Sequence, residues 1–103
     1  MPKSNAKNYK YVKISELPQW LEAYKKGFEC VKKFSAFSIY ENYGLYAYLL
    51  DIADYRFGNK KVDELAEILS KYTDKRMFKY ANDEYIMSLI QSLLLEVERI
   101  ALM

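Results

Sequence analysis

Four runs of apolar residues spaced three and four apart constrain the fold of this chain more than any other feature. That spacing places the apolar side chains of each run along one face of an α-helix. The runs cover about residues 15–34, 36–57, 60–72 and 82–103. The chain has only three glycines and two prolines, whereas sheet-rich folds with many tight turns need more of both. The sequence therefore predicts an all-α fold: a small four-helix domain, bundle-like or orthogonal.

The 103 residues suit a single domain, which we assign to residues 15–103. Residues 1–14 contain four lysines and show no helical periodicity. We predict that they form a flexible, basic N-terminal arm. Residues 9–14 alternate as a β-strand does, but we expect no second strand to pair with them. An extended segment that packs on the domain is the interpretation we favour.

The second and fourth runs carry more apolar surface than one helix of a small domain normally buries. The second run, residues 36–57, is apolar nearly all round, so its helix is expected to be central or shared with a second chain. Gly44 in the middle of this helix favours a close helix crossing there. The fourth run has apolar residues at steps of 4, 3, 4 and 3, which is a short heptad seam.

An exposed apolar surface beyond a few hundred Å² commonly marks an interface. We therefore predict a helical interaction protein that self-associates as a homodimer, or that is a small subunit of a larger complex, including a nucleoprotein complex. The alternative is that the second helix is the central helix of a monomer and that the seam is the inner face of a bundle helix. The candidate interface residues are Tyr43, Tyr46, Leu49, Ile86, Ile90, Leu93, Val97 and Ile100.

The distribution of lysines favours a second, different function. The net charge is only +2, but residues 1–33 carry eight lysines and three glutamates. Residues 71–80 interleave cations with aromatic rings, a mixture that neutralises phosphates and stacks on bases; the other interpretation is an amphipathic connector with its aromatic side chains in the core. The alternative function is therefore sequence-tolerant nucleic-acid binding. The candidate nucleic-acid contacts are Lys3, Lys7, Lys10, Lys13, Lys75, Arg76 and Lys79.

Four further lysines share one face of the first predicted helix: Lys25, Lys26, Lys32 and Lys33. Two glutamates, Glu22 and Glu29, lie on the same face at three- and four-residue spacing from them. Pairs at this spacing cancel much of the positive field. We therefore expect a solvated helix face rather than a phosphate-binding stripe.

The residues that carry most enzymatic chemistry are missing. The chain has no histidine and one cysteine, Cys30, which removes the commonest general base, the usual triads and thiolate zinc sites. Asp51 and Asp54 lie one turn apart and are a candidate pair for acid–base chemistry or a hard cation. We favour the interpretation that they mark the wet stripe of a buried helix, and that Cys30 is a small buried hydrophobic side chain. The sequence thus predicts a non-enzymatic protein without metal or cofactor.

The hydropathy of the chain indicates no membrane segment. No stretch approaches roughly 18 uninterrupted apolar residues, and no charged segment followed by an apolar one resembles a signal peptide. A single cysteine cannot form a disulfide within the chain. We expect a cytoplasmic protein with no membrane partner.

Overall fold

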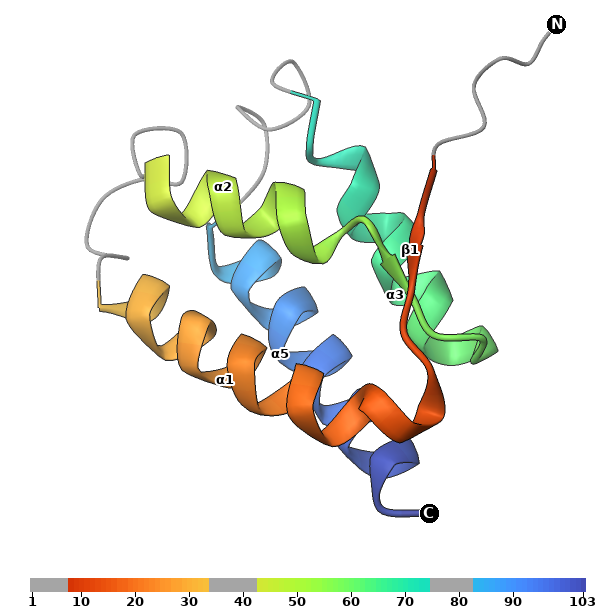
Figure 1. Ribbon diagram of the computed structural model, residues 1–103. Helices are drawn as coiled ribbons and strands as arrows, with labels where there is room; N and C mark the ends of the chain where they lie inside the picture. Colours follow the sequence, from red (N-terminus) through yellow and green to blue (C-terminus); the bar gives the residue numbers. More distant parts are fainter. Residues whose placement is uncertain (1–7, 34–42, 75–82) are drawn as a thin grey trace, which may run out of the picture.

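The computed structural model describes residues 8–33, 43–74 and 83–103. Within these ranges the chain is mostly helical, as predicted, and it also contains a small sheet that was not predicted (Figure 1). The helices are α1 (Leu17–Lys32), α2 (Tyr43–Ile52), α3 (Lys60–Lys71) and α5 (Asp83–Ala101), with a 3-10 turn η1 (Ile14–Glu16) before α1. The strands are β1 (Lys10–Tyr11) and β2 (Tyr55–Arg56).

The central helix of the fold is α5. It packs against α1 on one side and α3 on the other, while α2 packs on both α1 and α3 (Figure 1). The sequence analysis left two possibilities for the second helix, a central place or a face shared with a second chain. In the structure α2 exposes Gly44, Ala47 and Leu50, and the helix between α1 and α3 is α5.

Two tyrosines that count as apolar in the sequence pattern of the second helix also form hydrogen bonds through their hydroxyl groups. The Tyr46 hydroxyl donates a hydrogen bond to the Thr73 carbonyl at 2.8 Å, and the Tyr48 hydroxyl donates to the Tyr24 carbonyl at 2.6 Å. Each tyrosine packs its ring against the core and satisfies its polar tip on a neighbouring element. These half-buried tyrosines thus tie α2 to α1 and to the end of α3.

A close helix approach lies at Gly27 in α1, a position that the sequence analysis did not single out; Gly44, where a close crossing was predicted, is exposed. A Cβ atom at Gly27 would stand 2.9 Å from Cε2 of the Tyr48 ring. A glycine in α1 therefore allows the aromatic ring of α2 to lie directly against the α1 backbone.

The predicted second helix ends five residues earlier than expected, at Ile52 rather than at residue 57. After a turn, β2 runs parallel to β1, with Lys10 opposite Tyr55 and Tyr11 opposite Arg56. The Lys10 amide donates to the Asp54 carbonyl at 3.0 Å. The amide of Val12, which follows β1, donates to the Arg56 carbonyl at 2.9 Å. The expectation that residues 9–14 have no strand partner was therefore wrong.

The starts of α1 and α3 follow local signals to different degrees. Asn59 caps α3 with its side chain, which accepts a hydrogen bond from the Val62 amide at 3.1 Å. Gly58 has a φ of 71°, which fits a glycine in the turn before the cap. For α1, Ser15 is of a residue type that commonly caps helices, but it lies in the 3-10 turn and the cap position is Glu16.

Candidate interaction surfaces

The predicted interface residues are mainly core residues of the single chain. Five of them have exposed fractions of 0%: Leu49, Ile86, Ile90, Leu93 and Val97. Tyr46 and Ile100 are half-buried and pack against the same core, and the side chain of Tyr43 lies outside the described residues. The heptad seam of the fourth run therefore meets the other helices of its own chain, and a partner cannot reach it in this fold.

A different stripe of α5 remains accessible, along a groove between α1 and α5. Leu95 is 52% exposed and Leu102 is 82% exposed. Each lines one of two hollows, of about 110 and 320 Å³ respectively, and both hollows are also lined by Lys25 and Glu98. We call this continuous feature the α1–α5 groove.

Charged side chains divide the α1–α5 groove at its middle. Lys25 Nζ lies 2.9 Å from Glu98 Oε2, and these side chains are 50% and 37% exposed. Next to them Arg99, 70% exposed, pairs with Glu96 at 3.1 Å. The hydrogen bond from Lys61 and then that from Arg99 hold the pKa of Glu96 below its usual range. Lys25 and Glu98 therefore line both hollows of the groove, and each hollow has apolar and charged side chains in its lining.

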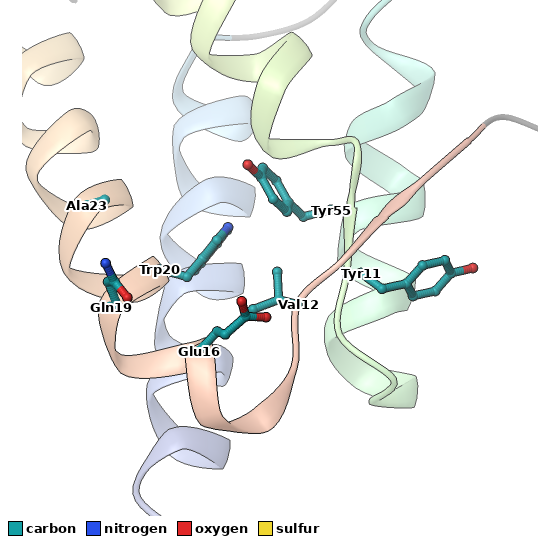
Figure 2. Close-up of a pocket in the computed structure, with 7 residues that line it drawn as sticks. All are labelled: Tyr11, Val12, Glu16, Gln19, Trp20, Ala23 and Tyr55. Carbon is teal, nitrogen blue, oxygen red and sulfur yellow. The ribbon is translucent and has the colours of Figure 1, made fainter.

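A second surface is the pocket of about 300 Å³ beside β1. Figure 2 shows the Tyr55 ring on one side of Trp20, and Glu16 and Gln19 on the other side. Val12, which follows β1, lies close to Glu16. Glu16 is the charged residue among those that line this pocket, and its side chain is held in place by a hydrogen bond from the Lys13 amide at 3.1 Å. We call this feature the Trp20 pocket.

The wall of the Trp20 pocket is part of an aromatic cluster. The Trp20 ring stacks on Tyr24 at 4.4 Å between centroids, and meets Phe57 and Tyr55 edge-on at 4.8 and 5.6 Å. Trp20 is 8% exposed, and its indole nitrogen has no hydrogen-bond partner among the described residues. Trp20 is therefore fixed by its ring contacts rather than by its polar atom.

Asp51 belongs to a structural hydrogen-bond cluster behind these rings. The Tyr24 hydroxyl donates to its carboxylate, and Lys10 Nζ lies 3.5 Å from it. Burial, followed by the hydrogen bond to Asp51, raises the pKa of Tyr24, and burial raises the pKa of Tyr48. Both tyrosines therefore remain protonated donors at neutral pH. Asp54 contributes its backbone carbonyl, which accepts from the Lys10 amide.

A buried cation on β2 was missed by the sequence reasoning. Arg56 is 6% exposed and donates to the Ala53 carbonyl at 2.7 Å and to Glu67 Oε2 at 2.9 Å. Its guanidinium carbon lies 3.8 Å from the centroid of the Tyr9 ring. The available signal was an arginine between two aromatic residues, Tyr55 and Phe57, because a buried cation needs fixed partners.

The structure describes two of the seven predicted nucleic-acid contacts. Lys10 pairs with Asp51, and Lys13 is exposed. The other five lie outside the described residues: Lys3, Lys7, Lys75, Arg76 and Lys79.

The lysines of α1 form the charge-balanced face that the sequence predicted. Lys26 lies 3.3 Å from Glu22, and Lys32 lies 3.4 Å from Glu29. Cys30, on the same helix, is exposed, so the expectation that it is buried was wrong.

Across residues 8–33, 43–74 and 83–103, no three Asp, Glu or Cys side chains gather in a way that would hold a metal ion. No helix in these ranges is both long enough and apolar enough to cross a membrane. A comparison of the chain with known protein families, curated proteins and solved structures found no match.

Proposed function

We propose that the protein is a non-enzymatic interaction protein that self-associates as a homodimer through the α1–α5 groove. The observation that carries this proposal is the self-complementary order of side chains along α5: Leu95, Glu98, Arg99 and Leu102. At about 100° per residue these four positions share one stripe of the helix, roughly 100° wide. An interface between two identical surfaces needs this kind of internal complementarity.

When two α5 helices pair antiparallel about a two-fold axis, each of these four residues lies opposite a complementary residue of the other copy. With the axis between Glu98 and Arg99, Leu95 of one copy lies opposite Leu102 of the other. Glu98 of each copy then lies opposite Arg99 of its partner, in addition to the pairs that Glu98 and Arg99 already form with Lys25 and Glu96 in their own chain. The two apolar hollows of the groove, on either side of Lys25 and Glu98, receive the two leucines.

The size of the groove sets the expected strength of the dimer. The hollows measure about 110 and 320 Å³, and the exposed apolar side chains at the groove are Leu95 and Leu102. An interface of this kind belongs with the small, weak ones. We therefore expect a dissociation constant on the order of micromolar or weaker.

Sedimentation velocity over a range of protein concentrations tests the proposal. The native chain is expected to shift from its monomer mass of 12.3 kDa toward twice that mass as concentration rises. Leu95→Asp and Leu102→Asp should each abolish the shift and leave the helical circular dichroism unchanged, since both residues are exposed. Leu50→Asp, which is 40% exposed on α2, is the matched control and should still dimerise.

A charge exchange tests the register. Glu98→Arg alone and Arg99→Glu alone each place like charges opposite one another and should weaken the dimer. The double variant restores opposite charges and should recover most of the association. A chain that stays monomeric at every concentration, or a double variant no better than the single ones, contradicts the proposed interface.

A further inference from the structure

One edge of β1 is paired with β2, and no strand among residues 8–33, 43–74 and 83–103 pairs with the other edge. The inward amides of β1, those of Lys10 and Val12, donate to the Asp54 and Arg56 carbonyls at 3.0 and 2.9 Å. Because backbone groups alternate along a strand, the N–H and C=O of Tyr11 point to the opposite edge. Among the described residues no group binds the Tyr11 amide, and Tyr11 is 74% exposed. An open strand edge is a template for a further strand.

Hollows on both sides of the sheet meet at this edge. The Trp20 pocket, of about 300 Å³, lies on the α1 side. A second, open hollow of about 410 Å³ lies on the α3 side, where Arg56 and Glu67 contribute to its lining. Tyr11 lines both, and Figure 2 shows its ring projecting away from Val12. A strand added beside β1 would place successive side chains alternately toward these two hollows.

The chemistry of the Trp20 pocket selects the side chain it takes. The rings of Trp20 and Tyr55 offer apolar walls, and the carboxylate of Glu16 is the charge at the rim. A lysine or arginine side chain matches this arrangement, because its aliphatic stem packs on rings while its cation reaches a carboxylate. On the α3 side, the rings of Tyr9 and Tyr11 are the apolar part of a lining that otherwise consists of charged side chains, three of them carboxylates. A β-branched side chain of the added strand would lie against these two rings.

We propose that the open edge of β1 binds an extended, basic peptide segment of a partner protein, which adds a third strand and places a lysine or arginine side chain in the Trp20 pocket. Main-chain hydrogen bonds to Tyr11 supply part of the affinity, and Glu16 with the two rings supplies the selectivity. This surface is separate from the α1–α5 groove, so this inference does not depend on dimerisation.

Trp20 provides a direct signal, because it is the single tryptophan of the chain. The probe is a synthetic peptide with blocked ends and the sequence Ser-Lys-Val-Lys-Val-Lys-Ser, titrated into the full chain. Binding is expected to shift the Trp20 fluorescence and to move the indole N–H resonance of Trp20. Two control peptides should give no such change: one with Glu in place of every Lys, and one with Pro in place of every Val, which lacks those amide donors.

Variants of the protein separate backbone pairing from side-chain contacts. Tyr11→Pro removes the outward amide, a change that an edge strand tolerates on its open side, and Tyr11→Ala removes the ring but keeps the amide. We expect Tyr11→Pro to bind the lysine peptide about fivefold more weakly than Tyr11→Ala does. Glu16→Gln keeps an acceptor for the Lys13 amide and should weaken binding about threefold.

The outcomes that would overturn the proposal are equally direct. Equal affinity of the lysine peptide for Tyr11→Pro and Tyr11→Ala would remove the strand pairing, and equal affinity of the lysine and glutamate peptides would remove the basic partner. A change of oligomeric state in Tyr11→Pro, without a change in peptide binding, would show that a second copy of the chain occupies the edge instead. If Tyr11→Pro does not fold, as judged by circular dichroism, the proline-containing peptide decides the question in the native chain.

Discussion

Two tyrosine hydroxyls link α1 and α2 through hydrogen bonds that require their protons. Tyr24 donates to the carboxylate of Asp51, and Tyr48 donates to the Tyr24 carbonyl. Burial is the main reason that the pKa of each tyrosine is raised, and the carboxylate of Asp51 acts in the same direction. These residues therefore connect the stability of the fold to alkaline pH.

The free energy of unfolding is expected to fall as the pH rises above about 10. Below that value the two tyrosines carry their protons in both the folded and the unfolded chain, so they add no pH dependence. Above it the unfolded chain loses these protons first, which favours unfolding. Urea unfolding, followed by circular dichroism from neutral to alkaline pH, measures this decline. The double variant Tyr24→Phe with Tyr48→Phe should show a shallower alkaline slope than the native chain.

Tyr11→Phe is the matched control for this prediction, because it removes an exposed hydroxyl. An alkaline slope that is equally steep in the native chain and in the double variant would contradict the assigned role of the two buried hydroxyls.

At this scale some residues have an environment that is set locally. The Asn59 cap of α3 needs only the next turn of its own helix, and the Gly58 turn needs only its neighbours. The environments of Arg56 and Cys30 depend on which elements pack around them. Arg56 binds Glu67 because β2 lies beside α3, a contact that no local pattern contains.

At the scale of the elements, α1 and α2 pack closely where Gly27 of α1 faces the Tyr48 ring of α2. Alanine at Gly27 would favour the helix by about 1 kcal/mol, but its Cβ would stand 2.9 Å from the Tyr48 ring. We expect Gly27→Ala to give little or no gain in the native chain, and to stabilise a Tyr48→Ala chain by about 1 kcal/mol. Urea unfolding of the four members of this cycle measures the difference. Equal effects of Gly27→Ala in both backgrounds would show that the close approach has no energetic consequence.

Some ends of the helices are set by local sequence signals, and others are set by contacts with distant parts of the chain. The predicted helix of residues 60–72 agrees with α3 to within one residue, because Asn59 and the apolar spacing are both local signals. The end of the second helix was missed by five residues. Apolar residues continue through Phe57, and what ends the helix is the pairing of β2 with Lys10 and Tyr11, more than 40 positions earlier in the chain.

For the molecule as a whole, the position of α5 decides where a core mutation has its largest effect. Leu93 is 0% exposed on α5, within the core that all four described helices share. Leu93→Ala is expected to cost about 2–5 kcal/mol and to lower the stability of every helix together. Leu95→Ala, on the exposed stripe of the same helix, should cost less than about 1 kcal/mol. Urea unfolding monitored by circular dichroism and by Trp20 fluorescence should give coincident transitions for both variants.

Loss of the Trp20 signal at a different urea concentration from the loss of helix, in either variant, would contradict a single cooperative core. A small effect of Leu93→Ala would contradict the central position of α5.

The interface prediction shows what sequence patterns leave open at this scale. Apolar periodicity identified Ile86, Ile90, Leu93 and Val97 as one seam, and the structure buries all four. Periodicity states that a helix face is covered, but not whether a neighbour in the same chain or a second chain covers it. The stripe with Leu95 and Leu102 became visible only when α1 and α3 had been placed on α5.

The central place of α5 also has a consequence for biosynthesis. Translation delivers α1, α2 and α3 before it delivers the helix that they pack around. At about 5–20 residues per second, the 30 residues from the end of α3 to the end of α5 take a few seconds to be added. During that interval the apolar faces that α1 and α3 turn toward α5 are uncovered, so we expect them to be the surfaces most prone to aggregation until α5 is complete.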